Sequence, residues 1–451
     1  MKTPKRTINL RSAIGIVIAN MIGSGVFITS GIIAGKLPGP LWVLSFWIIG
    51  GIIALLGALC YSELATRMPE VGGEYIYLGK LFHPIFGFLA GWTSFIVGFS
   101  APIAGSALGF SEYIFSGLNI ENIYSQELVI ILKKVLAVVI VLLFTILHYR
   151  GIKTGVFVQN ILVLIKIIVI IGLVLAGFIL YEQNFSYLSE DFRVSSNDIA
   201  FGTAMMLIMF SYSGWNAVSY IAGEIKNPRR NIPFSLILGT LIVTVFYIVL
   251  NLLILVSLPF NDVQGVIAVF EKVFVNIFGE FTGNSLSIIL GIFLVSSLSA
   301  FIIIGPRIYY AMAKDRLFFK FASQIHPVFE VPSRSIAIQG SLAIIFVIFS
   351  SIEQLFVYLY YALNLFPMMA VLGIFIARKR GIGDETSVNV IGYPIVPALF
   401  IIFSFYLAII AFIDRPIESI AAIATILFGI PCYFILLRFT SNDNKGLLKS
   451  S

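Results

Sequence analysis

Two short stretches rich in Gly and Ser interrupt long apolar segments, and their backbone could do the chemistry of a binding site. The first contains Gly23, Ser24 and Gly25, and the second contains Ser213 and Gly214. Both residue types weaken a helix. At membrane depth, non-helical backbone is tolerated only where it is buried in protein or lines a watery cavity. The breaks therefore predict peptide N–H and C=O groups that a ligand can reach in the middle of the molecule.

The first break favours an anion. The half-helix that follows it begins with peptide N–H groups that have no partner within the helix, and its dipole favours negative charge. Ser24, Gly25 and Val26 would therefore suit a carboxylate. Glycine lets a ligand approach the backbone closely, and the Ser24 hydroxyl adds a further donor.

The second break favours a cation. Carbonyl groups released around Phe210 and Ser213 are acceptors that suit an ammonium group. Donors at one break and acceptors at the other match the zwitterionic head of an α-amino acid better than a sugar or a nucleobase. Trp215 follows this break directly, so we expect it to lie beside the site.

Lys166 is the other residue with evident chemistry. It lies about 12 residues into the apolar segment 154–181, which is roughly 18 Å at 1.5 Å per residue and too deep to snorkel. No acidic residue lies at comparable depth, so its expected partners are carbonyls at the first break and the hydroxyls of Ser296, Ser297 or Ser299. It could act as a fixed cation in place of sodium, as a group that gains and loses a proton, or only as a link between helices.

The amino-acid composition shows whether the chain is surrounded by water or by lipid. Of 451 residues, 59% are hydrophobic and 11% charged, and the mean hydropathy is +1.01, which indicates a polytopic membrane protein. The net charge of +7 is dispersed over short connectors, so no nucleic acid partner is expected. Cys60 and Cys432 both lie in apolar runs and the three histidines lie near the ends of spans, so no metal site and no cofactor are predicted.

The elements that position these residues are apolar runs long enough to cross about 30 Å of hydrocarbon. An all-α bundle of twelve such spans is expected. They cover residues 12–36, 41–66, 83–115, 131–149, 154–181, 197–223, 233–257, 284–313, 335–352, 355–377, 394–413 and 417–437.

The basic residues predict the orientation. With the N-terminus in the cytoplasm, 22 of the 29 Lys and Arg residues fall on the cytoplasmic side. This asymmetry indicates an even number of spans across the cell membrane, with both termini on its cytoplasmic side.

The two breaks also predict an internal repeat. They lie in the first and sixth runs, and because five spans separate them, two five-helix halves would enter the membrane from opposite sides. A single transporter domain over 1–451 is therefore expected, with one repeat over 12–181, an inverted repeat over 197–377 and two additional helices over 394–437.

Four motifs carry a resemblance to a known family. They are Ile22–Phe27, Phe210–Asn216, Gly223–Pro233 and Arg307–Asp315. At these motifs the chain resembles the amino acid–polyamine–organocation superfamily and, within it, the L-type amino acid transporter branch and its bacterial homologues.

The resemblance implies five-plus-five inverted repeats with broken helices one and six, followed by two extra helices. It implies a substrate carboxylate on Ser24, Gly25 and neighbouring amides, with the amino group on the carbonyls of Met21, Phe210 and Ser213. Phe210 looks like the family's aromatic gate, Asn216 like its pocket-lining asparagine, and Lys166 like the lysine that replaces sodium. The predicted substrate-binding residues are Met21, Ile22, Gly23, Ser24, Gly25, Val26, Phe210, Ser211, Ser213 and Asn216; the gating residues are Phe210 and Trp215; and the sodium-substituting or proton-coupling residues are Lys166, Ser296 and Ser297.

The chain departs from the family pattern at two places. The connector from Ser116 to Ile130 has no cysteine, so a disulfide-linked glycoprotein heavy chain, as in animal members, is not expected. Phe301 and Ile302 stand where many relatives carry a small or polar pair, which affects the pocket floor and therefore side-chain selectivity.

Together these features predict a sodium-independent transporter of neutral L-amino acids that works by alternating access and exchange. Neutral substrates are expected because no deep carboxylate would pair with a basic side chain. A proton-coupled symporter of the same fold is the alternative, and a receptor that does not transport is less favoured. An enzyme is not expected, because no nucleophile, base and oxyanion constellation lies at depth.

Overall fold

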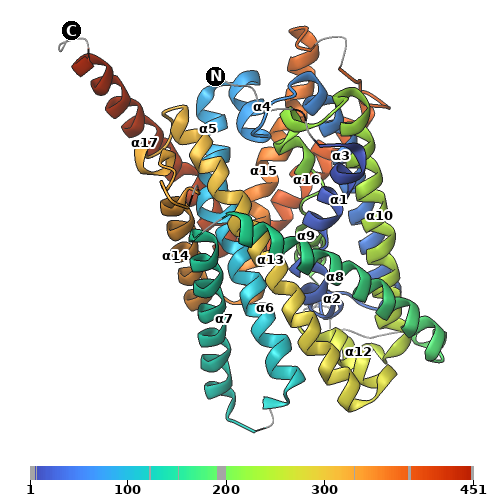
Figure 1. The fold of residues 1–451 in the computed structure, drawn as a ribbon. Coiled ribbons are helices and arrows are strands. Elements are labelled where there is room, and N and C mark those ends of the chain that lie inside the picture. The colour runs from blue at the N-terminus through green and yellow to red at the C-terminus, as the bar shows by residue number, and fades with distance from the viewer. Residues whose placement is uncertain are drawn as a thin grey trace.

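The computed structural model is helical throughout the residues it describes, which are 6, 8–120, 123–150, 152–189, 200–329, 331–383 and 387–447 (Figure 1). The first half contains α1 (Leu10–Met21), α2 (Ser24–Ala34), α3 (Pro40–Arg67), α4 (Glu74–Leu81), α5 (Pro84–Thr93), a π-helical turn η1 (Ser94–Gly98), α6 (Ser100–Gly117), α7 (Gln126–Tyr149), α8 (Ile152–Leu180) and η3 (Phe185–Ser189). The second half contains α9 (Phe201–Ser211), η4 (Ala217–Tyr220), η5 (Ala222–Glu224), α10 (Pro228–Ser257), α11 (Phe260–Val263), α12 (Val269–Phe278), α13 (Glu280–Lys314), η6 (Lys320–Ser323), α14 (Ser333–Phe349), α15 (Ile352–Lys379), α16 (Ile395–Asp414) and α17 (Pro416–Leu447).

Within the described residues, eight helices are long and apolar enough to cross a membrane, or nine if the bent pair of α1 and α2 forms one span. The expected run 154–181 corresponds to the 29-residue α8, in which the segment Leu164–Leu180 is apolar. The expected runs 197–223 and 335–352 correspond to the shorter apolar helices α9 and α14, of 11 and 17 residues. The sixth run is short because its helix ends at Ser211, and its residues 197–199 lie outside the described part. The polytopic, all-helical prediction agrees with the structure, whereas the number of twelve spans stays a prediction.

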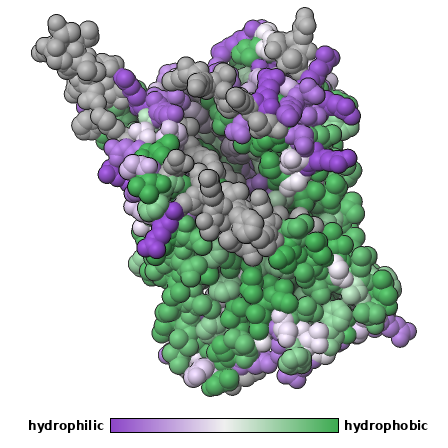
Figure 2. Space-filling view, viewed as in Figure 1, coloured by the Kyte–Doolittle hydropathy of each residue, from purple (hydrophilic) through white to green (hydrophobic). Residues whose placement is uncertain are grey.

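The surface separates into polar ends and an apolar middle. Figure 2 shows a broad hydrophobic surface below a strongly hydrophilic end, with a thinner hydrophilic rim opposite. The hydrophilic end carries α4 and the start of α10 (Figures 1 and 2). This distribution is what a protein surrounded by lipid at mid-height requires.

Both predicted helix breaks are present. The axes of α1 and α2 differ by 41°, and Gly23 between them has extended backbone and no side-chain cap. After α9 the chain turns through Tyr212–Asn216, and only the short 3₁₀ turns η4 and η5 precede α10. The peptide groups that the breaks release must therefore find partners outside their own helices.

The broken helices form the centre of the bundle (Figure 1). Every residue of α2 is buried, and so is every residue of α9 after Phe201. Helix α2 packs against α9, α10 packs against α1 and α3, and α15 packs against α9. The surrounding helices therefore hold both breaks away from lipid.

A buried ion-pair network joins the end of α3 to the end of α15. The Glu63 side chain is fully buried, and its carboxylate accepts hydrogen bonds from Arg67 Nε at 2.8 Å and from Arg378 Nε at 2.8 Å and Nη2 at 2.7 Å. The peptide N–H of Val390 donates to the same carboxylate at 2.7 Å. Four hydrogen bonds compensate the desolvation of this charge and fix the segment after α15 against α3.

We expect Glu63→Ala to destabilise the fold strongly, because it leaves two guanidinium groups without their carboxylate. Removing one partner of such a buried pair costs on the order of 3 kcal/mol. Thermal unfolding of the purified protein in detergent measures the loss. Glu70→Ala is the matched control, since the Glu70–Lys80 pair is about half exposed and its loss should hardly change the midpoint. Equal midpoints for the two variants would contradict the structural role given to Glu63.

Candidate functional site

The two broken helices touch at Gly25. A Cβ atom at this position would lie 2.5 Å from the Cα of Ser211, so only glycine allows α2 and α9 to approach so closely. The same contact is joined by a hydrogen bond of 2.9 Å between the hydroxyls of Thr29 and Ser211. The first turns of α2 and the last turn of α9 therefore form one packed unit.

The turn after α9 contacts the end of α1 in the same way. Gly214 has a φ of +98°, a left-handed conformation that favours glycine. A Cβ atom there would lie 2.9 Å from the carbonyl carbon and oxygen of Asn20. Each break thus packs against the other broken helix, which brings the donors of one break close to the acceptors of the other.

Tyr247 of α10 bridges the two breaks. Its buried hydroxyl lies within hydrogen-bonding distance of the carbonyl oxygens of Met21 and of Ser211, the latter at 3.0 Å. Its ring packs against Trp47 and Tyr212, with ring centroids 5.3 and 5.1 Å away. Sequence reasoning missed Tyr247, because a tyrosine within an apolar span carries no pattern that marks it as a site residue.

Lys166 of α8 lies against the first break. Its side chain is 2% exposed, and its ammonium group donates to the carbonyl oxygen of Ile22 at 2.6 Å and to the Ser297 hydroxyl at 3.4 Å. The predicted contacts with a break carbonyl and with Ser297 are confirmed. A buried cation therefore satisfies a peptide oxygen that the break released.

The other two serines, which the sequence offered as alternative partners of Lys166, are engaged elsewhere. The Ser296 hydroxyl donates to the carbonyl of Phe293 at 2.7 Å, and the Ser299 hydroxyl pairs with Nε2 of His148 at 2.8 Å. The physical reason is helical rotation. Successive residues point about 100° apart, so a single helix cannot present three serines to one ammonium group.

The predicted gating residues are buried among other aromatic rings. Phe210 is 5% exposed and stacks on Phe356 of α15, with centroids 4.0 Å apart and planes 22° from parallel. The Trp215 ring packs edge-on against Tyr61 at 4.8 Å and against Phe400 of α16 at 5.9 Å. Phe210 thus connects the second break to α15, while Trp215 connects it to α3 and α16.

Asn216 contacts a buried acid that sequence reasoning missed. Its side-chain amide donates to Oε1 of Glu74 at 2.8 Å, and the Tyr61 hydroxyl donates to the same oxygen at 2.7 Å. Glu74 is 5% exposed and begins α4, a short helix in the connector after α3. A search for charges inside the apolar runs does not reach a connector. The Gly72–Gly73 pair before Glu74 was the one signal of a tight turn into the protein.

The remaining backbone groups of the breaks define what the site can bind. Gly23 caps α2 without a side-chain hydrogen bond, and the first N–H groups of a helix have no acceptor within it. Among the acceptors, the carbonyl oxygen of Met21 accepts a hydrogen bond from the Gly23 N–H at 2.8 Å, and that of Phe210 accepts one from the Ser213 N–H at 2.9 Å. The arrangement offers clustered N–H donors at α2 and peptide oxygens beside them. These would match the carboxylate and the ammonium group of a zwitterion.

The family model described as amino acid permease matches residues 8–436, which is nearly the whole chain. The chain belongs to this family. The permease is 31% identical to the serine/threonine exchanger SteT of Bacillus subtilis, over 95% of this chain and 96% of that protein. It is 28% identical to the b(0,+)-type amino acid transporter 1 of Mus musculus, over 96% and 88% of the two chains. It is 25% identical to the Asc-type amino acid transporter 1 of the same species, over 96% and 81%.

These matches identify the permease as an amino acid transporter of the amino acid–polyamine–organocation superfamily and as a multi-pass membrane protein. The resemblance inferred from the four motifs is thereby confirmed.

In the part of the chain that the structure describes, no three His, Cys, Asp or Glu side chains lie together as the ligands of a metal ion would.

We expect Gly25→Val to abolish binding of every amino acid substrate alike. The new side chain would overlap the Ser211 backbone and push α2 away from α9, which displaces the donors that all substrates would share. Binding of labelled serine, alanine and leucine to the purified permease measures the effect.

Gly15→Ala is the control for this substitution, because a Cβ at Gly15 meets nothing within 4 Å. It should bind all three amino acids normally. If Gly25→Val instead binds some substrates well and others poorly, the shared carboxylate site is not at the start of α2.

Proposed function

We propose that this permease exchanges neutral L-amino acids across the cytoplasmic membrane, without sodium, by alternating access. The observation that carries the proposal is the contact between the two helix breaks beside the first turn of α2. The similarity to a protein named as a serine/threonine exchanger supports both exchange and neutral substrates.

The substrate's α-carboxylate binds the N–H groups of Ser24, Gly25 and Val26 in this proposal. The positive end of the α2 dipole and the freedom of these donors favour the charge. The α-ammonium group binds the carbonyls of Met21, Phe210 and Ser213. It shares the first two with the peptide N–H groups that they already accept, and that of Met21 also with the Tyr247 hydroxyl. Binding therefore draws the two breaks together around the part that all α-amino acids have in common.

Sodium independence follows from Lys166 in this proposal. Its ammonium group contacts the Ile22 carbonyl at 2.6 Å and the Ser297 hydroxyl at 3.4 Å. Such oxygens would otherwise suit a small metal cation. A covalently attached cation keeps the break satisfied throughout the cycle without an ion gradient.

Neutral specificity is supported by the state of the nearest buried acid. The Glu74 carboxyl group already accepts hydrogen bonds from Tyr61 and Asn216. In this proposal those two hydrogen bonds hold the Glu74 carboxyl group away from the substrate, so that a lysine or arginine side chain would find no carboxylate within reach. In this proposal Asn216 lines the pocket, and Glu74 orients its side-chain amide.

Helix packing supports a fold of two inverted five-helix repeats over 12–181 and 197–377. In four packed pairs, a helix of the first half contacts the helix at the equivalent position of the second half. These pairs are α2 with α9, α3 with α10, α6 with α13, and α7 with α14. A pseudo-two-fold axis between the halves would bring equivalent helices together in this way. The two additional helices over 394–437 correspond to α16 and α17.

Alternating access uses the breaks as hinges in this proposal. Phe210 closes over the substrate from one side by stacking on Phe356, and Trp215 fixes the other half of the broken helix against α3 and α16. Both termini lie in the cytoplasm, as the basic residues indicate. No disulfide-linked heavy chain is needed, because Cys60 and Cys432 both lie in apolar helices.

Proton-coupled symport is the second candidate, and the burial of Lys166 is the observation that favours it. A lysine that loses its proton during the cycle would release the Ile22 carbonyl and loosen the first break. In exchange, by contrast, Lys166 stays charged. The two mechanisms differ in their response to a pH gradient.

We expect proteoliposomes loaded with labelled serine to release it when serine, alanine or leucine is added outside, at the same rate with and without sodium. Arginine outside should release little, and a pH gradient should not drive accumulation. Exchange requires a substrate on both sides, so uptake into empty vesicles should be much slower. Equal uptake into empty and loaded vesicles would contradict exchange, and gradient-driven accumulation would favour symport.

We expect Lys166→Ala to lose most of its exchange activity, because the Ile22 carbonyl would be buried without its partner. Leaving one such group unsatisfied costs about 1–3 kcal/mol, which corresponds to roughly fivefold to 150-fold in activity. Lys134→Ala is the matched control, since Lys134 also donates to a carbonyl, that of Ile348, but at an exposed site. Its exchange rate should be unchanged, and full exchange by Lys166→Ala would remove Lys166 from the mechanism.

A further inference from the structure

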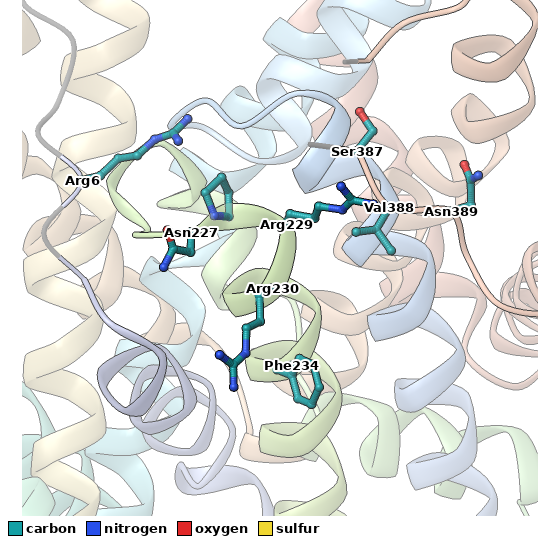
Figure 3. A pocket seen from close by; sticks show the side chains of 9 residues that line it. Arg6, Asn227, Arg229, Arg230, Phe234, Ser387, Val388 and Asn389 are labelled. Atoms are coloured by element: carbon teal, nitrogen blue, oxygen red, sulfur yellow. The ribbon is translucent and has the colours of Figure 1, made fainter. Parts of the chain in front are cut away.

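A basic cavity of about 770 Å³ lies beside the start of α10, outside the substrate site. Figure 3 shows its lining side chains coming from the N-terminal segment, from the first turns of α10 and from the segment after α15, with Arg229 extended toward Val388. It is lined by Arg6, Asn227, Pro228, Arg229, Arg230, Phe234, Ser387, Val388 and Asn389.

The cavity carries a concentrated positive charge. Arg6, Arg229 and Arg230 are exposed. Among the described residues, no carboxylate lines the cavity and none pairs with these three arginines. The positive end of the α10 dipole adds to the same field, and its N-cap Asn227 makes no side-chain capping bond. The complement of such a lining is an anion with several acceptor oxygens.

An apolar face of α10 continues directly from the arginines. Arg230 lies one turn before Phe234, which is 56% exposed. Further exposed apolar residues follow at helical spacing on the same face, while the opposite face, from Ile232 through Leu236 to Val243, is buried in the bundle. They are Leu238, Leu241, Ile242 and Val245.

We propose that this cavity binds the phosphate headgroup of an anionic phospholipid whose acyl chain lies along the exposed face of α10. Guanidinium groups pair with phosphate oxygens through two parallel hydrogen bonds. The positive charge of three guanidinium groups exceeds what a zwitterionic headgroup would neutralise. A free phosphate would use the arginines but would leave the apolar face without a function. The lipid uses both, so its charged and apolar parts match a continuous feature of the surface.

Native mass spectrometry of the detergent-purified permease tests the proposal, with phosphatidylglycerol, phosphatidylcholine or inorganic phosphate added in turn. We expect phosphatidylglycerol to be retained in preference to phosphatidylcholine, and inorganic phosphate at millimolar concentration neither to be retained nor to displace it. The double variant Arg229→Gln/Arg230→Gln should weaken retention on the order of tenfold or more, since each cation near an anionic lipid contributes about 1 kcal/mol.

Lys314→Gln/Arg438→Gln is the charge-matched control, because both residues are exposed and neither lines the cavity. It should retain phosphatidylglycerol as the parent does. Phe234→Ser removes the apolar contact beside the arginines and should also weaken lipid retention. A single size-exclusion peak for each variant shows that it is folded.

Two results would overturn the proposal. One is equal loss of phosphatidylglycerol in the cavity variant and the control variant, which would mean a non-specific charge effect. The other is retention of inorganic phosphate that competes with the lipid and is insensitive to Phe234→Ser, which would identify a site for soluble phosphate. Neither result bears on substrate exchange, so the outcome is separable from the proposed function.

Discussion

The close contact between α2 and α9 at Gly25 is the constraint on which the rest of the structure depends. Two helices interrupted in the middle of a membrane protein release peptide groups where no solvent can hydrogen-bond them. Because Gly25 lets the α2 backbone approach that of Ser211, the two breaks share their partners instead of each needing its own. Thr29 and Tyr247 complete this arrangement with side-chain hydroxyls.

The partners of the breaks come from helices that are not themselves interrupted. Lys166 lies on α8 and Tyr247 on α10, and each contacts a carbonyl of the first break. The proposed binding site, which is made of backbone groups, thus obtains its rigidity from side chains of the surrounding helices. Phe356 of α15 does the same for the aromatic ring of Phe210. Peptide groups can recognise only what all α-amino acids share, so discrimination among their side chains has to come from such surrounding residues.

Sequence reasoning predicted the position of both breaks and the burial of Lys166 against the first break. These succeed because glycine chemistry and membrane depth are local properties that a single chain displays. Sequence reasoning left open which of several similar residues would be the neighbour. Ser296, Ser297 and Ser299 are equivalent on the sequence, yet only Ser297 faces Lys166. Glu74 was missed because it reaches its buried position from a connector. The twelve spans and the inverted repeat stay predictions.

The sequence by itself determined that the chain lies in a membrane, that two of its helices are interrupted and which family it belongs to, and hence that it transports amino acids. Each of these rests on composition, on residue type or on motifs contiguous in the chain. Only the tertiary structure decided which groups come together. Tyr247 contacts the carbonyls of both breaks, Glu74 contacts Asn216, and the arginines of α10 line one cavity with the segment after α15. Such contacts depend on the rotation of each helix about its axis and on neighbours far apart in sequence. A change of one residue turns a side chain by about 100°, and no local pattern records which direction faces a partner.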